Sequence, residues 1–141
     1  MGNRWPVTIS TVVVCDLYVC VMRMDRGFCF PWAVLDWGEE STEEACAQHL
    51  DDIMHLDRVD KPICWLPIDI RSTPGRPSFL PDYSMDIGYM TILASSDLCD
   101  FRSGEFEWQL VNFEEDGFPR VLCGDHLQLW TAAQDMIRII R

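Results

Sequence analysis

Hydrophobic and polar positions along the chain follow two periods, and these periods predict its strands and helices. The run VTISTVVV at residues 7–14 is rich in β-branched side chains, which predicts a central strand. Residues 17–24 predict its partner across a tight turn near Asp16, with residues 25–27 as a loop. Further strands are expected over residues 32–35, 63–70, 85–94 and 106–113, and Pro67 should place the second of these at a sheet edge or a bulge.

Residues 37–56 contain the clearest helix, and its start is well specified. Ser41 is a good N-cap, and Glu44 lies three residues further on, as in a capping box. Helical spacing predicts a core-facing stripe of Cys46, Ala47, Leu50, Ile53, Met54 and Asp57, apolar except for the last. The opposite side carries Glu44, Gln48, Asp51, Asp52 and His55.

A second helix is expected at the C-terminus. Asp125 and Gln128 form a box-like start, and a core stripe of Trp130, Ala133, Ile137 and Ile140 follows. Residues 72–84 hold three prolines and a glycine, which predicts a long irregular loop. The order of strands, helix, strands and helix predicts an α/β fold, a mixed sheet flanked by helices.

Size and composition narrow the class of protein. A chain of 141 residues that is 48% hydrophobic is expected to form a single domain, residues 1–141. No apolar run reaches the roughly 20 residues of a membrane helix, and no signal peptide is evident, so a soluble cytoplasmic protein without a membrane partner is expected. The net charge of −12 argues against nucleic acid and suits a cation site or a basic protein partner.

The seven cysteines are scattered and form no Cys-x-x-Cys pair. Their odd number and their spacing fit reduced thiols in a cytosol and argue against a structural zinc site. Several lie within apolar strand patterns, where a thiol acts as a small core residue. No sequence signature supports a catalytic cysteine.

The order of these parts resembles the Nudix hydrolase family, in particular its ADP-ribose and NADH subgroup. The resemblance implies an α/β/α sandwich around a mixed sheet. It is spread over nearly the whole chain and rests on the order of short segments. These segments are Pro6–Ile9, Val19–Arg23, Phe30–Ala33, Pro74–Pro77, Trp108–Phe113, Phe118-Pro119 and Gly124–His126.

The family's signature is a box of glycine, five residues, glutamate, seven residues, Arg-Glu, an apolar residue, one residue, Glu-Glu, one residue and glycine. Its carboxylates lie on a helix and hold magnesium or manganese, which binds phosphate oxygens and activates water to cleave a nucleoside diphosphate linkage. The chain departs from this pattern. The box arginine becomes Gln48, the next glutamate His49, the Glu-Glu pair Asp52-Ile53 and the closing glycine His55, while Glu39 or Glu40 keeps the glutamate after the loop.

Three functions follow from this degenerate box. The first is a domain without catalysis and without a metal cofactor that binds a nucleotide such as ADP-ribose and acts as a sensor, regulator or inhibitor. Arg76 would meet phosphate and Trp32 or Trp37 would stack on a base, as would Phe79, Tyr83 or Tyr89, although packing is the plainer explanation for each aromatic residue.

The second is a divergent hydrolase of ADP-ribose or NADH, in which Glu40 and Asp52 are catalytic. Glu39, Glu40, His49 and Asp52 would then be the metal ligands, with Glu105 or Glu107 as further oxygen donors. The cation would be magnesium or manganese, although histidine favours zinc, copper or iron-type metals. The third is an acidic module that binds a protein and no nucleotide. The resemblance also makes a homodimer one expectation.

Overall fold

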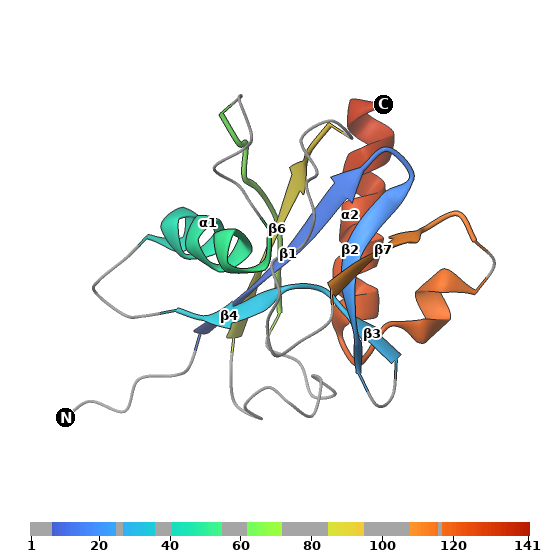
Figure 1. The fold of residues 1–141 in the computed structure, drawn as a ribbon, viewed down its shortest axis with the longest axis horizontal. Coiled ribbons are helices and arrows are strands. Elements are labelled where there is room, and N and C mark those ends of the chain that lie inside the picture. The colour runs from blue at the N-terminus through green and yellow to red at the C-terminus, as the bar shows by residue number, and fades with distance from the viewer. Residues whose placement is uncertain are drawn as a thin grey trace.

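Strand β1 (Val7–Cys15) runs through the centre of the sheet and is buried along its whole length. The structure, a computed structural model, describes residues 7–24, 27–35, 41–54, 62–71, 85–94, 108–115 and 117–141. Figure 1 shows β1 beside β6 (Met85–Ile92), with which it pairs in parallel from Val7↔Met85 to Val14↔Ile92. A strand with both faces covered needs apolar side chains throughout, which explains its run of β-branched residues.

The remaining strands extend this pair on both sides. Within the described residues the sheet has seven strands in the order β3-β2-β1-β6-β5, with β4 paired to β1 and β7 paired to β2. All pairs other than β1 with β6 are antiparallel, so the sheet is mixed. The other strands are β2 (Tyr18–Met24), β3 (Gly27–Cys29), β4 (Trp32–Val34), β5 (Leu66–Arg71) and β7 (Trp108–Asn112).

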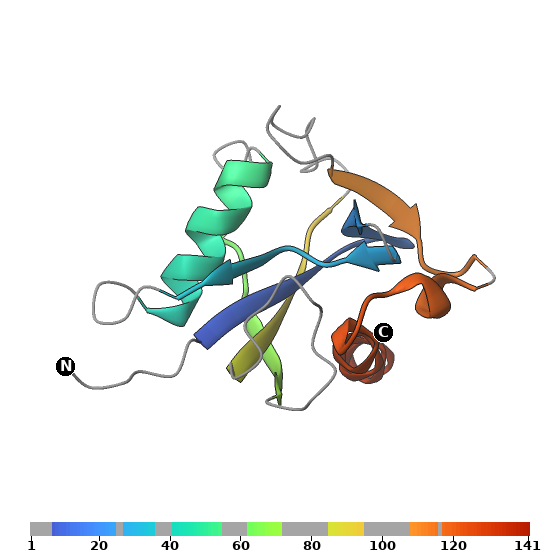
Figure 2. The same cartoon turned by 90° about the horizontal axis from the view of Figure 1, so that it is seen from below.

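Helices α1 and α2 cover opposite faces of this sheet, as Figure 2 shows in a view from below. Helix α1 (Thr42–Ile53) lies on one face, and α2 (His126–Ile140) lies on the other, preceded by the short 3-10 helix η3 (Phe118–Val121). Neither α1 nor α2 is long and apolar enough to cross a membrane.

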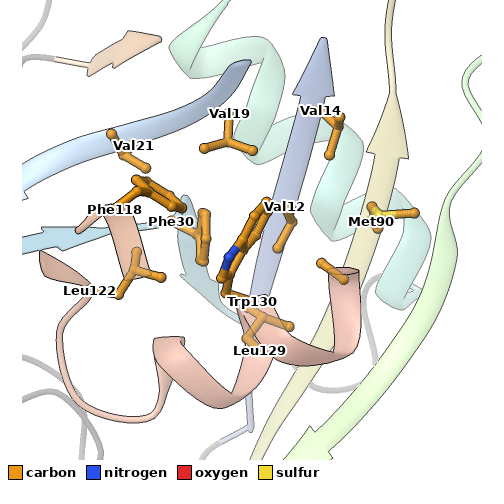
Figure 3. Packing of buried hydrophobic residues seen from close by; sticks show 11 residues of the cluster. Val12, Val14, Val19, Val21, Phe30, Met90, Phe118, Leu122, Leu129 and Trp130 are labelled. Atoms are coloured by element: carbon orange, nitrogen blue, oxygen red, sulfur yellow. The ribbon is translucent and has the colours of Figure 1, made fainter. Parts of the chain in front are cut away.

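The sheet divides the core between its two faces. On the α2 face, Trp130 lies among aromatic rings, and Figure 3 shows Phe30 and Phe118 near it, with ring centroids 6.2 Å and 5.2 Å from its own. The ring centroid of Phe113 is 5.1 Å from that of Trp130. On the α1 face, Leu50 and Ile53 pack with Val13 in an aliphatic cluster. The N-terminal part of α1 packs on a neighbouring cluster that includes Tyr89.

The predicted fold class is confirmed, and the predicted strands are present with small changes at their ends. β5 is the edge strand, and its pairing with β6 shifts register between Pro67 and Asp69, so both consequences expected of this proline are seen. Asp16 forms the tight turn with φ of 53°. Residues 25–27 were predicted to form a loop, and this prediction is wrong at Gly27. Gly27 is the first residue of β3, because it pairs with Met24 across the hairpin.

The helix predictions are confirmed in position and corrected in detail. Asp125 precedes α2, but the predicted capping box is wrong, because its carboxylate lies 3.1 Å from Arg71 instead of bonding the helix N–H groups. Ile140 is 46% exposed, so the predicted core stripe of α2 is wrong at this last position. On α1, Ala45 is buried where Ala47 was expected, and Asp57 lies outside the described residues.

Candidate functional site

Helix α1 carries the described part of the candidate site, and its first turn fixes its position. The hydroxyl of Ser41 accepts a hydrogen bond from the backbone N–H of Glu44 at 3.1 Å, as the sequence predicts. The Glu44 carboxylate accepts from the Ser41 hydroxyl at 3.2 Å, which takes the place of the reciprocal backbone contact of a capping box. The hydroxyl of Thr42 is 2.6 Å from that of Tyr89, which ties the same turn to the sheet.

The three helix positions that the family resemblance assigns to glutamate lie in three different environments. Asp52 is exposed, His49 is half-buried, and Ile53 is 4% exposed inside the aliphatic cluster. Gln48, at the arginine position, is exposed. The inner part of this helix face is therefore apolar where a metal site would require charge.

His49 is a half-buried polar residue of α1. Burial lowers its pKa from 6.5, and the Asp52 carboxylate one turn later opposes this shift in part. The imidazole is consequently neutral at pH 7. Its Nε2 atom is buried and has no hydrogen-bond partner among the described residues. This combination fits either a space-filling imidazole or a nitrogen ligand for a metal.

A metal centre requires more donors than these. Within the described ranges no group of three His, Cys, Asp or Glu side chains is arranged to hold a metal ion. Magnesium prefers six oxygen ligands, whereas the box positions described on α1 offer one carboxylate, that of Asp52, and one nitrogen, that of His49, a donor set that does not fit this cation. Glu39, Glu40, His55, Glu105 and Glu107 lie outside the described residues.

The candidate stacking residues are not gathered at α1. Trp32 pairs with Ser10, and directly paired residues of antiparallel strands project to the same face. Ser10 faces α2, because the next residue, Thr11, contacts Cys46 of α1. Half-buried Trp32 therefore lies on the face of the sheet opposite to His49 and Asp52. Trp37, Arg76, Phe79 and Tyr83 lie outside the described residues.

Tyr89, the remaining aromatic candidate, is part of the core. It is 7% exposed, it packs in the cluster of Val7 and Ala45, and its hydroxyl contacts Thr42. Its ring face is covered by protein, which leaves no surface for a base to stack on. Packing in the core, and not stacking on a base, therefore explains the position of Tyr89.

Comparison with solved structures gives a consistent result. The Nudix domain of NrtR from Shewanella oneidensis, solved with ADP-ribose, superposes with a TM-score of 0.73 at 16% identity, covering 96% of this chain and 90% of that one. A MutT/Nudix protein from Listeria innocua has a TM-score of 0.71 at 17% identity, covering 97% and 96% of the two chains. The chain has the Nudix fold.

A third protein with the Nudix fold is larger than this chain. The bifunctional NMN adenylyltransferase/ADP-ribose pyrophosphatase of Francisella tularensis, solved with AMP and a manganese ion, matches with a TM-score of 0.66 at 10% identity. The match covers 96% of this chain and 42% of that one. No protein-family profile matches the sequence, and no curated protein matches it significantly. The likeness is therefore one of fold.

On the other face of this Nudix fold lies a polar centre that sequence analysis missed. Arg71 contacts three carboxylates, those of Asp69 at 3.0 Å, Asp125 at 3.1 Å and Asp86. Asp86 also accepts hydrogen bonds from Thr8 at 2.6 Å and Ser10 at 2.9 Å. The available signal was a charge, Asp86, inside an apolar strand. This buried ion network fixes the N-terminus of α2 to the sheet.

Proposed function

We propose that this protein binds a nucleotide of the ADP-ribose type and has lost metal-dependent pyrophosphohydrolase activity, so that it acts as a sensor, regulator or inhibitor. The observation that carries the proposal is Ile53, which lies in the aliphatic cluster at a position where the family's chemistry needs a metal-binding glutamate. A charged side chain there would have to be buried among Val13, Leu50 and Leu93.

The neighbouring positions support the same conclusion. A neutral imidazole at position 49 replaces a carboxylate and contributes no negative charge to hold magnesium. Removing one group that stabilises charge can cost roughly 10²–10³ in rate, and two box glutamates are replaced by His49 and Ile53. Losses within one catalytic unit do not multiply, yet either loss alone is large.

Nucleotide binding is supported by the ligands of proteins with the same fold. The Shewanella domain was solved with ADP-ribose and the Francisella protein with AMP. In this chain Arg76 would contact the diphosphate, and Trp32 or Trp37 would contact the base. Because Trp32 lies on the α2 face, its contribution would require a ligand that extends around the sheet edge formed by β4.

The second candidate is a divergent hydrolase, which the spacing of His49 and Asp52 favours. The two side chains are three residues apart on α1 and close enough for the carboxylate to raise the pKa of the imidazole. Together with Glu39 or Glu40 they would make a mixed nitrogen and oxygen site. In this case Glu40 and Asp52 would be essential for turnover.

One experiment separates these candidates. Thermal unfolding is recorded with ADP-ribose, AMP or NADH, with and without magnesium, manganese or zinc, and the same samples are analysed for released AMP. We expect ADP-ribose to raise the Tm by several degrees without a divalent cation and without AMP release. Arg76→Ala should remove the shift, whereas Asp52→Ala should keep it.

Other outcomes assign the protein differently. Metal-dependent AMP release that Asp52→Ala abolishes would establish the hydrolase. A protein that shows no shift with any nucleotide, and that forms a salt-sensitive complex with a basic protein, would be the acidic interaction module. Its mass in solution would settle whether it forms the homodimer that the resemblance implies.

A further inference from the structure

Two cysteines from distant parts of the chain lie side by side next to the start of α2. Cys29 is the last residue of β3, and Cys123 lies between η3 and α2. A parallel bridge joins the preceding residues, Phe28 and Leu122, and the backbone N–H of Cys123 donates to the carbonyl of Phe28 at 2.8 Å. The bridge brings the two thiols to corresponding positions of neighbouring segments.

The backbone contact limits the separation of these two residues. Ordinary covalent geometry from the Phe28 carbonyl places the two Cα atoms within about 7 Å of each other, and neighbouring strands lie ~4.8 Å apart. Disulfides join Cα atoms separated by roughly 4.4–6.8 Å. Residues at the same position of a parallel pair also project to one face of the sheet. The geometry therefore permits a bond between the two Sγ atoms.

The two thiols differ in access to solvent. Cys123 is partly exposed, whereas Cys29 has no exposed surface. We propose that Cys123 and Cys29 form a reversible redox pair, in which Cys123 reacts first with a hydroperoxide and Cys29 then closes a disulfide. This inference is independent of nucleotide binding and of the proposed loss of hydrolysis.

The reaction balances in two steps. The Cys123 thiolate attacks the terminal oxygen of the hydroperoxide, which gives a sulfenic acid and, after protonation, an alcohol or water. The Cys29 thiolate then attacks the Cys123 sulfur, the S–S bond forms, and the hydroxyl leaves as water. Two thiols lose two hydrogen atoms, and the peroxide takes up the two electrons. An added dithiol reverses the oxidation.

The surroundings of both thiols make this oxidation slow at neutral pH. Burial raises the pKa of Cys123, and burial together with the neighbouring Cys123 raises the pKa of Cys29 to about 12. Since the thiolate is the attacking species, oxidation should accelerate as the pH rises. The pair should therefore respond to sustained peroxide and not to brief exposure.

The disulfide would strengthen a contact that already exists. The backbone N–H of Phe30, next to Cys29, donates to Nδ1 of His126 at 3.0 Å, and the two rings stack. An S–S bond beside this contact would fasten β3 to the start of α2 and close a loop of roughly 95 residues, which restricts the unfolded chain. A rise of Tm by roughly 5–15 °C is expected from such a loop.

Peptide mapping after oxidation tests the proposal. The full chain is treated with hydrogen peroxide, free thiols are alkylated, and the digest is searched for linked cysteines by mass. We expect a peptide pair joining Cys29 and Cys123, the loss of two hydrogen atoms from the monomer, and a higher Tm that a dithiol reverses. Cys123→Ser should abolish all three changes, whereas Cys64→Ser, at an exposed thiol, should leave them intact.

Three results would overturn the proposal. The first is Cys123 as sulfenic or sulfinic acid with Cys29 recovered as a free thiol. The second is Cys29 joined to Cys20, a buried thiol whose own pKa is raised by burial and by the neighbouring Cys29. The third is Cys123 joined to a second chain. Mapping of the unmodified sequence distinguishes these results even if a cysteine variant fails to fold.

Discussion

The two faces of the sheet differ in the contacts that their buried polar side chains make. On the α2 face Arg71 is 4% exposed and contacts the carboxylates of Asp69, Asp86 and Asp125, while Trp130 packs near the rings of Phe30 and Phe118. On the α1 face the core is aliphatic, and the half-buried His49 leaves its Nε2 atom without a hydrogen bond to any described residue. The α2 face holds a buried ion network, and the α1 face holds an imidazole nitrogen without such partners, although Nε1 of Trp130 on the α2 face also has no hydrogen-bond partner among the described residues.

This difference indicates which face of the sheet tolerates fewer substitutions. A buried charge tolerates few substitutions, because removing its partner leaves it uncompensated. The outer side of α1, with Gln48 and Asp52 exposed, carries no such constraint. A chain can therefore keep the architecture through the α2 face while the box positions of α1 change. Under our proposal this is how the catalytic residues were lost without loss of the fold.

The largest expected effect comes from breaking the ion network. Arg71→Met removes the cation and leaves the buried carboxylates of Asp86 and Asp125 facing each other, so the free energy of unfolding should fall by roughly 3–5 kcal/mol. Urea denaturation measures this loss. Arg138→Met is the control, because its pair with Asp135 spans 3.7 Å on the exposed side of α2 and should change stability by under about 0.5 kcal/mol. If the free energy of unfolding fell equally in Arg71→Met and Arg138→Met, the ion network would not contribute to stability beyond an exposed ion pair.

The second prediction tests the apolar replacement on the α1 face. Ile53→Glu restores the residue of the family box but places a carboxylate in the cluster of Val13, Leu50 and Leu93. The free energy of unfolding should fall by roughly 2–4 kcal/mol, and no magnesium-dependent turnover should appear. Asp52→Glu, at the exposed neighbouring position, serves as the control. A stable Ile53→Glu protein that gains magnesium binding would mean that this position still lines an open site.

Sequence patterns were sufficient for the elements that depend on local chemistry. The β-branched run of β1 and the Ser41 cap of α1 each carry their own signal over a few residues, and both were predicted in place. The edge position of β5 followed from Pro67, whose missing N–H disfavours a central strand.

Long-range contacts were not predictable in this way. Asp125 has the sequence of a helix cap, yet its carboxylate is drawn to Arg71, 54 residues away. The register that places Asp86 beside Thr8 likewise depends on the parallel pairing of β1 with β6. In the candidate site, the burial of Ile53 was predicted from helical spacing and is confirmed. That the Nε2 atom of His49 has no hydrogen bond to any described residue could not be predicted, because it depends on how α1 sits on the sheet.

The third prediction concerns the start of α1. Ser41→Ala removes the acceptor for the Glu44 N–H, and the free energy of unfolding should decrease by about 1 kcal/mol. Ser41→Asp keeps an acceptor at the cap and is expected to restore most of that loss. Urea denaturation of both variants measures the two values. If Ser41→Asp were as unstable as Ser41→Ala, the contribution of Ser41 would not come from this hydrogen bond.

The smallest expected effect is a change in the pH dependence of stability, and it comes from His49. Its pKa in the folded protein lies below 6.5, the ordinary value, because burial disfavours the charged form. As the pH falls through about 6.5 the unfolded chain takes up the proton first, so stability decreases until the folded pKa is passed. His49→Leu should therefore flatten the decline in unfolding free energy between about pH 7.5 and about pH 5.5.

Gln48→Leu, at the preceding exposed position, is the matched control for this titration, because it adds the same side chain and keeps the imidazole. Its pH profile should follow that of the unmodified protein. Added zinc gives a further distinction. If the His49 imidazole is a metal ligand, zinc should raise the free energy of unfolding of the protein in proportion to the occupancy of the site. If the imidazole only fills space, the pH dependence of the free energy of unfolding should be the same with and without zinc. A zinc-dependent gain that His49→Leu removes would move the protein from the binding proposal toward the divergent hydrolase.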